Sequence, residues 1–232
     1  MMCLRYEVNF LNIGYNSILE LQEKTDKLQK LFQKVDQQTH DLSCKASLHC
    51  LPGCGACCEN PNVESTVLEF LPLSIELWQK NQSEDLLRLL NKTEEGTSCI
   101  LYKADPNIPG NGRCTQYELR PLLCRTFGYA ARLNKYGEKE LATCKKISLD
   151  QPESIKRAQK LIDEGLDVPV FSEAWLALLD IDPGLATDRY PMNVALKTAL
   201  EKIGYWRDCS QSDTLENHDY SNQNSRSKKN LF

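Results

Sequence analysis

The most regular hydrophobic pattern in the chain lies near its N-terminus. Apolar residues and threonines recur there at intervals of three or four positions: Ile18, Leu21, Thr25, Leu28, Phe32, Val35, Thr39 and Leu42. This spacing puts all of them along one side of an α-helix, so we predict a long amphipathic helix over 17–43. Such a stripe can form a coiled-coil seam, but the two threonines favour packing against the rest of the same chain.

Further helical patterns occupy much of the remaining chain, and β structure is sparse. The segments 129–133 and 139–143 flank an Asn-Lys-Tyr-Gly turn and predict one short hairpin. Apolar residues then return to helical spacing up to about residue 206. We therefore predict a mainly α fold with little β structure.

Composition and charge argue against several classes of protein. The chain has 28 Lys and Arg against 32 Asp and Glu, a net charge of −4, which gives no electrostatic reason to expect a nucleic-acid partner. No stretch approaches the roughly 18 apolar residues of a membrane-spanning helix. The first residues also lack the basic and apolar regions of a secretory signal. We therefore expect a cytoplasmic protein with no membrane partner.

Cysteine is the one unusual feature of the composition. Eleven of the 232 residues are cysteines, and nine of them lie between Cys44 and Cys144. In a reducing compartment this density favours metal ligation or redox chemistry over disulfides, and an odd number cannot pair completely. We expect the isolated Cys3, Cys44 and Cys209 to behave as small buried hydrophobic residues.

Eight cysteines have the spacing of metal ligands: Cys50, Cys54, Cys57, Cys58, Cys99, Cys114, Cys124 and Cys144. Thiolates two or three residues apart can turn toward one metal, and intervening glycines let the backbone bend for this. Eight thiolates suffice for two four-thiolate sites, or for one cluster with spare sulfurs. Because adjacent side chains diverge, we expect either that Cys57 and Cys58 bind different metals or that one of the two is not a ligand.

The cysteine region resembles a known family. Its segment 112–128 reads GRCTQYELRPLLCRTFG and is similar to the C-x-x-Y-x-x-R-P-x-x-C-R block of cysteine-cluster proteins named for a CxxCxxCC motif; the CILY at 99–102 also fits. Cys54, Cys57 and Cys58 keep the spacing of that motif, whereas three residues rather than two separate Cys50 from Cys54, which leaves the role of Cys50 open. The resemblance implies chelation of zinc or iron.

The metal and the chemistry stay open at this point. Thiolate coordination suits both zinc and an iron–sulfur cluster; eight sulfurs exceed what one zinc needs, which leans toward iron–sulfur. His49 could replace a thiolate or be only a polar neighbour. Arg120 and Arg125 could support the site or bind an anion, or could pair with carboxylates such as Glu118.

Three classes of function remain compatible with these residues. The first is a metal-chelating protein. The second is an enzyme of methyl transfer or redox chemistry that uses the cysteine cluster; a flagellin lysine methylase carries a related cysteine domain, which supports this class by analogy alone. The third is a thiol redox sensor without metal. The sequence does not decide whether the protein is an enzyme.

These patterns divide the chain into five predicted parts. In order they are an N-terminal arm, a long amphipathic helix, a cysteine-cluster metal-binding domain, C-terminal helices that pack on it, and a disordered tail: 1–16, 17–43, 44–148, 149–206 and 207–232.

Overall fold

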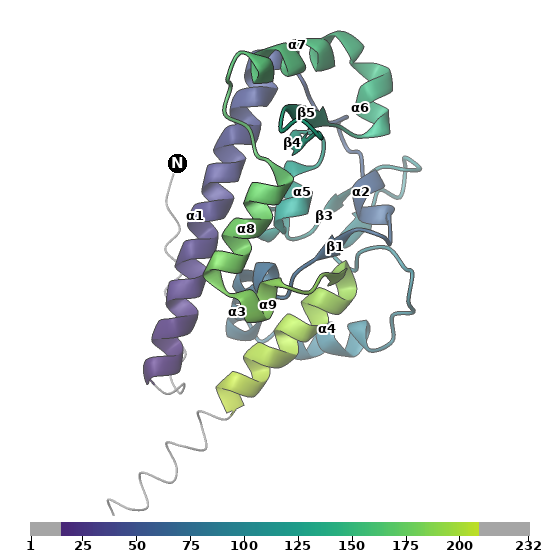
Figure 1. Ribbon diagram of the computed structural model, residues 1–232. Helices are drawn as coiled ribbons and strands as arrows, with labels where there is room; N and C mark the ends of the chain where they lie inside the picture. Colours follow the sequence, from purple (N-terminus) through teal and green to yellow (C-terminus); the bar gives the residue numbers. More distant parts are fainter. Residues whose placement is uncertain (1–14, 209–232) are drawn as a thin grey trace, which may run out of the picture.

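The computed structural model describes residues 15–208, so Cys3, Cys209, most of the predicted arm and nearly all of the predicted tail lie outside the described residues. The long helix α1 spans Tyr15–Ala46 and runs the length of the molecule (Figure 1). Its predicted stripe faces the interior, since Leu28 and Leu42 are fully buried and Thr25 is nearly so. The stripe therefore packs against the same chain.

The fold is mainly α, as predicted. After α1 come α2 to α9, in order Ala56–Glu59, Leu71–Gln79, Ser83–Leu90, Leu122–Thr126, Lys145–Asp150, Pro152–Asp163, Phe171–Ile181 and Pro183–Ala186. Residues 192–208 form one more helix. Short 3-10 turns precede α3 and α5, at Leu68–Phe70 and Tyr117–Leu119. Within the described residues, no helix has the length and apolar character needed to cross a bilayer.

The strands form three small antiparallel pairs in the described part of the chain. The predicted hairpin is confirmed as β4 (Ala130–Leu133) with β5 (Lys139–Ala142). Two further pairs were not predicted: β2 (Tyr102–Ala104) with β3 (Gly112–Cys114), and β1 (Glu64–Ser65) with β6 (Tyr190–Pro191). Their two or three residues are too short to show the alternation that marks a strand in sequence.

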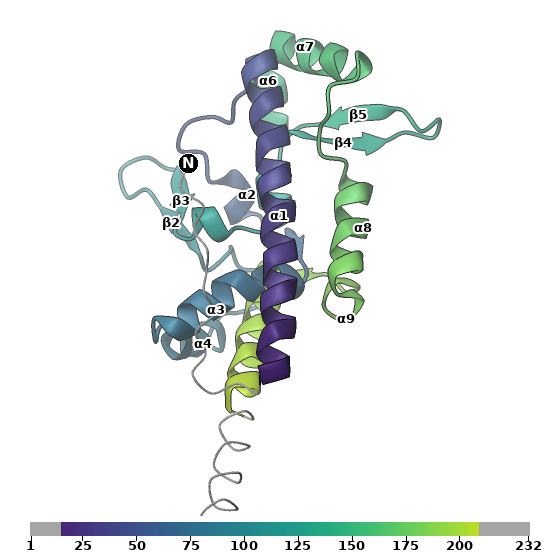
Figure 2. The same ribbon diagram turned by 90° about the vertical axis from the view of Figure 1, so that its left-hand side faces the viewer.

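Two apolar cores lie along α1. One joins α1 to α3, α5, α8 and the helix at 192–208; the other joins the last turns of α1 to β4, α6 and α7. Cys99, Cys114 and Cys124 pack against the first core, and Cys144 packs against the second. In Figure 2, α2 and the β2–β3 pair lie on one side of α1, and α8 and the β4–β5 hairpin on the other. Cysteines of the predicted site thus contact both cores, and both cores include residues of α1.

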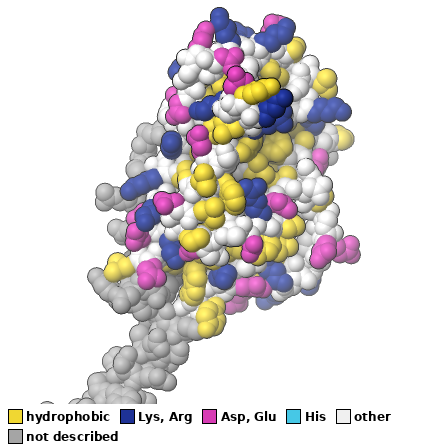
Figure 3. Space-filling view, viewed as in Figure 1, with side chains coloured by type: hydrophobic (Ala, Val, Ile, Leu, Met, Phe, Trp, Pro, Cys, Tyr) yellow, Lys and Arg dark blue, Asp and Glu magenta, His cyan; other side chains and the backbone are white. Residues whose placement is uncertain are grey.

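On the face shown in Figure 3, Lys and Arg side chains are interspersed with Asp and Glu around an area of hydrophobic side chains. Charges of both signs are mixed over this face, and neither sign covers a broad area of it.

Candidate metal centre

All eight predicted ligands line one cavity. Its volume is about 720 Å³, and its wall includes Cys50, Cys54, Cys57, Cys58, Cys99, Cys114, Cys124 and Cys144. Every cysteine in the described residues is a free thiol. The cavity therefore collects sulfur donors that lie up to 94 positions apart in the chain, between Cys50 and Cys144.

Backbone hydrogen bonds bring the separate cysteine segments together. The N–H of Cys99 donates to the carbonyl of Cys58 at 3.0 Å, and the N–H of Gly112 donates to the carbonyl of Gly53 at 2.8 Å. The N–H of Cys50 donates to the hydroxyl of Tyr129 at 2.7 Å. The first two bonds join main chain to main chain and the third joins Cys50 to a side chain, and together they hold the loops around the cavity.

Backbone N–H groups act on several of the sulfurs. Those of Leu51, Cys58, Leu101 and Gln116 act to lower the pKa values of Cys50, Cys57, Cys99 and Cys114, respectively, and the N–H of Ile147 donates a hydrogen bond to the sulfur of Cys144. The last of these caps α6, whose first turn begins at Cys144, with a distance of 3.4 Å. In addition, the ammonium of Lys146 lies 3.5 Å from the sulfur of Cys54. Such donors favour the thiolate form, which is the form that binds metals.

Two sets of cysteines can be named by the thiolates that act on one another, although Cys57 acts on members of both. The first set is Cys50 with Cys54, Cys57 and Cys144, which act on it; the second set is Cys58, Cys99, Cys114 and Cys124, on all of which Cys57 also acts. Burial raises the pKa of Cys50, and the thiolates that add to this rise all belong to the first set. Burial raises the pKa of Cys99 to about 11 and that of Cys124 further; the thiolates that add to these rises belong to the second set, together with Cys57.

Cys57 stands at the boundary between the two sets. A hydrogen bond from the neighbouring Cys58 thiol lowers the pKa of Cys57 to about 6, and the guanidinium of Arg120 contributes to the lowering. The same bond raises the pKa of Cys58. The short helix α2 therefore carries two adjacent cysteines whose pKa values are shifted in opposite directions.

Two glycines of the cysteine region make room for an aromatic ring. A Cβ atom at Gly55 or at Gly112 would lie 2.3 Å from the ring of Tyr102. The hydroxyl of Tyr102 donates to the carboxylate of Glu59 at 3.2 Å and to the carbonyl of Asn111 at 3.0 Å. The ring thus fastens α2 to the β2–β3 pair, which is a packing role.

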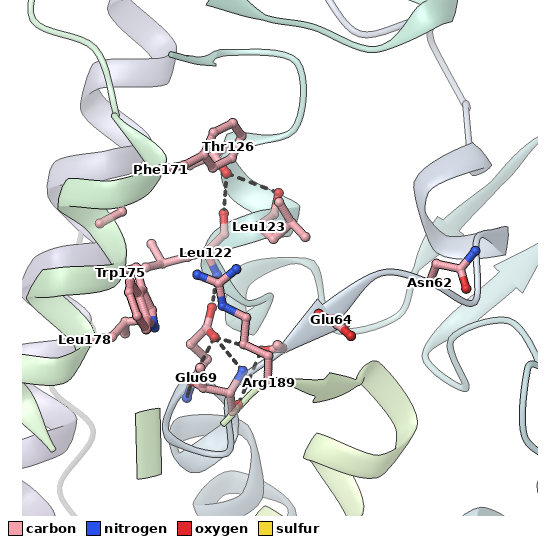
Figure 4. Close-up of a pocket in the computed structure, with 13 residues that line it drawn as sticks. Asn62, Glu64, Glu69, Leu122, Leu123, Thr126, Phe171, Trp175, Leu178 and Arg189 are labelled. Atoms are coloured by element: carbon pink, nitrogen blue, oxygen red, sulfur yellow. Dashed lines mark hydrogen bonds between the residues drawn. The ribbon is translucent and has the colours of Figure 1, made fainter. Parts of the chain in front are cut away.

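A buried carboxylate positions the helix that carries Cys124. Glu69 is 4% exposed, and its Oε2 accepts hydrogen bonds from the Ser65 hydroxyl and from both the hydroxyl and the N–H of Thr66, while its Oε1 accepts the N–H of Leu122 at 2.8 Å. Figure 4 shows Glu69 beside a second cavity, bonded to Leu122 at the start of α5. The bond to Leu122 could not be predicted from the sequence, because 53 residues separate the two groups.

Arg125 pairs with a carboxylate, but not with the one named as an example. Its guanidinium bonds the carboxylate of Asp36 on α1 and the backbone carbonyls of Glu118 and Arg120, and it lies over the ring of Phe32. The side chain is only 4% exposed. Arg125 therefore ties α5 to α1; of the two alternatives, pairing with a carboxylate is the one seen, with Asp36 in place of the Glu118 given as an example.

Arg120 has a different environment from Arg125. Its guanidinium lies over the ring of Tyr117 and 3.8 Å from Asp36, and it lines the cysteine cavity. Its Nε is buried and, within the described residues, has no hydrogen-bond partner. Arg120 thus keeps an unused donor next to the sulfurs, and it acts electrostatically on Cys57 and Cys114.

Three residues at or just after the end of α1 were considered in the sequence analysis, and the structure shows where each lies. Cys44 was expected to be a buried hydrophobic residue, but it is exposed, because it lies on the solvent side of α1. His40, judged from sequence to be poorly placed to complete a site, lines the cysteine cavity and contacts Cys44. The ring of His49 contacts the hydroxyl of Ser43 at 3.1 Å.

The sulfurs line the cavity wall and do not surround a common metal position. As arranged, no three His, Cys, Asp or Glu side chains of residues 15–208 converge closely enough to hold a metal ion. The chemistry of the donors nevertheless fits a thiophilic metal, because all eight are free thiols and they line a common cavity.

Comparison with known proteins agrees with this chemistry. No curated protein and no solved structure matched the chain. Residues 49–147 match the family model named CxxCxxCC, which is described as "Putative zinc- or iron-chelating domain". The match includes all eight cavity cysteines and leaves out α1 and the helices from α7 onward. The similarity to the CxxCxxCC domain family thus covers residues 49–147 of this chain.

Proposed function

We propose that this protein chelates metal through two four-thiolate sites, formed by the first and second sets, and that the first set holds an iron–sulfur cluster. The observation that carries the proposal is the single cavity lined by eight free thiols, which supply enough sulfur for two four-thiolate sites. A reducing compartment such as the cytoplasm would keep these thiols available for metal.

The spacing of the first set supports iron–sulfur in particular. Cys50, Cys54 and Cys57 lie close together in sequence and Cys144 is remote, an arrangement similar to the three near and one distant cysteines of plant-type ferredoxins. Backbone N–H bonds to cluster sulfurs are a known means of setting the reduction potential. When bound, such a cluster supplies one-electron transfer.

The chain's own residues would position and shield such a group. Lys146 and Arg120 place positive charge near the thiolates of both sets, which offsets the repulsion among them. Tyr129 and Tyr102 hold the loops that carry the first cysteines. Glu69 and Arg125 hold α5, and with it Cys124, against the helical cores.

Two double variants test the division into sets. Cys50→Ser with Cys144→Ser should remove the metal of the first set only, and Cys99→Ser with Cys124→Ser that of the second only. The measurement is iron, zinc and acid-labile sulfide per chain after anaerobic purification, together with the absorption spectrum near 400 nm. Loss of all metal in both double variants would contradict two separate sites, and a colourless wild-type protein with zinc alone would contradict the cluster.

The rest of the cavity wall favours a second candidate function. In this candidate the protein is an enzyme that acts on an anionic small molecule beside the cluster. The cavity of about 720 Å³ is also lined by Arg113, Arg120, Lys145 and Lys146. The Nε of Arg120 is buried and, among the described residues, has no hydrogen-bond partner. We propose that such a molecule would bind there through this positive charge. Arg120→Met, with metal content unchanged, should abolish binding of the anionic redox cofactor that the wild type binds in a thermal-shift screen; wild-type protein that binds no such cofactor contradicts this candidate.

A further inference from the structure

A thiol and an imidazole lie together on α1, outside the matched family domain. His40 and Cys44 are one helical turn apart, and the sulfur of Cys44 is 3.6 Å from Nε2 and 3.9 Å from Nδ1 of His40. Both side chains are exposed. Residues four apart on a helix project from the same face, so this pairing follows directly from the backbone.

The separation of the two atoms suits a shared metal ion. Zinc binds thiolate sulfur at about 2.3 Å and imidazole nitrogen at about 2.0–2.1 Å. In a tetrahedral site those bond lengths put sulfur and nitrogen about 3.5 Å apart. The Nε2-to-sulfur distance in this protein is 3.6 Å, which matches that separation. Because Nδ1 is nearly as close to the sulfur, at 3.9 Å, the exposed imidazole would turn about its side-chain bonds to direct Nε2 at an ion shared with Cys44.

The pair stands on a rigid support at the edge of the cysteine cavity. The neighbouring Leu42 and Ala46 are fully buried in the second core, which fixes this turn of α1. His40 and Ser43 belong to the wall of the cavity, and so does Cys50. Ligands held by a packed helix are better placed for binding than ligands on a free loop.

We propose that His40 and Cys44 form an accessory, exchangeable site for a divalent metal ion that favours sulfur and nitrogen ligands, of which Zn²⁺ is the example tested. The ion would bind Cys44 as thiolate, with its proton released to solvent, and the neutral Nε2 of His40, and water would complete its coordination shell. Two protein ligands hold an ion less firmly than four, so this site would exchange its metal while the cavity sites keep theirs.

The test uses the purified full-length protein with its native metal content. Zn²⁺ is added in equilibrium dialysis, and the bound zinc above the starting content is counted. The wild type should bind one additional zinc, and His40→Gln and Cys44→Ser should each bind it at least tenfold more weakly. Equal binding of the additional zinc by the wild type and Cys44→Ser, or no additional zinc in the wild type, would overturn the proposal.

A relocation variant controls for composition and for nonspecific binding. His40→Gln combined with Gln37→His moves the imidazole to a position seven residues from Cys44, about 10.5 Å along the helix axis, where both cannot bind one ion. Gln37 is exposed, so the helix should form normally, which circular dichroism checks. This variant should bind like His40→Gln; wild-type binding by it would overturn the proposal. The starting metal content, measured in the same samples, reports separately on the cavity sites.

Discussion

The helical cores and the cysteine cavity are held together in different ways. Along α1, the stability comes from apolar side chains such as Leu28, Phe70 and Leu200, which are almost fully buried. Around the cavity, the elements are short and are joined by single polar contacts, among them the bonds of Glu69, Arg125 and Tyr102. One region therefore has many small, redundant contacts, and the other depends on a few specific ones.

This difference explains why the cysteine region has so little regular structure. Helices of four to six residues, such as α2 and α5, cannot form on their own. Their positions are fixed by buried hydrogen bonds and, under our proposal, by metal–thiolate bonds. The contrast predicts that perturbations of the two regions have separable effects, and the following experiments test this in order of expected size.

Removal of metal should have the largest effect. Structural zinc sites contribute about 10–16 kcal/mol of apparent binding free energy to folding, so we expect a chelator to lower the thermal midpoint strongly. Hydrogen exchange should rise throughout 49–147 while the buried amides of α1 stay protected. If the thermal midpoint and helicity of metal-free protein matched those of the loaded protein, a structural role for metal would be untenable.

Arg125→Met tests the polar connection between α5 and α1. The substitution leaves Asp36 and two backbone carbonyls without their donor, and breaking a buried ion pair costs about 3–5 kcal/mol. Because Asp36 is 43% exposed, we expect the lower end of that range. Urea denaturation measures the change in unfolding free energy, and Arg113→Met at an exposed position of the same cavity serves as the control, with little change expected.

Leu28→Ala tests the helical core. Leu28 is fully buried, and truncation of such a residue costs about 2–5 kcal/mol. The free energy of unfolding should fall by that amount, while metal and sulfide per folded chain stay at the wild-type value. Leu19→Ala, at a half-exposed position of the same helix, should change stability by less than about 0.5 kcal/mol. A loss of metal in Leu28→Ala would show that the two regions are not separable.

The same contrast decides what the sequence could predict. The helix α1 was predictable because its eight stripe positions lie within a single element and repeat at the helical period. The hairpin β4–β5 was predictable from its local turn. By contrast, the β2–β3 pair was missed, because its strands have three residues each and a loop rich in Gly and Pro lies between them.

Within the candidate site, local spacing singled out the eight cysteines but not their environment. The partner of Arg125 is Asp36, 89 positions away, and no local pattern could indicate it. The exposure of Cys44 depends on which face of α1 meets the cores. Its contact with His40 could have been anticipated, because an interval of four residues on a predicted helix places the two side chains together.

Glu69→Gln is expected to have the smallest effect of the four and is the most local test. The amide that replaces the carboxylate must put its NH₂ group either against the N–H of Leu122 or against the donors of Ser65 and Thr66, so at least one buried donor loses its acceptor. Such a loss costs about 1–3 kcal/mol. Hydrogen exchange should rise first at the Leu122 amide and in α5, whereas Glu64→Gln, at an exposed position beside the same second cavity, should leave both stability and exchange unchanged. If the two variants behaved alike, Glu69 would not be what positions α5, and the placement of Cys124 would rest on Arg125 and the surrounding apolar contacts.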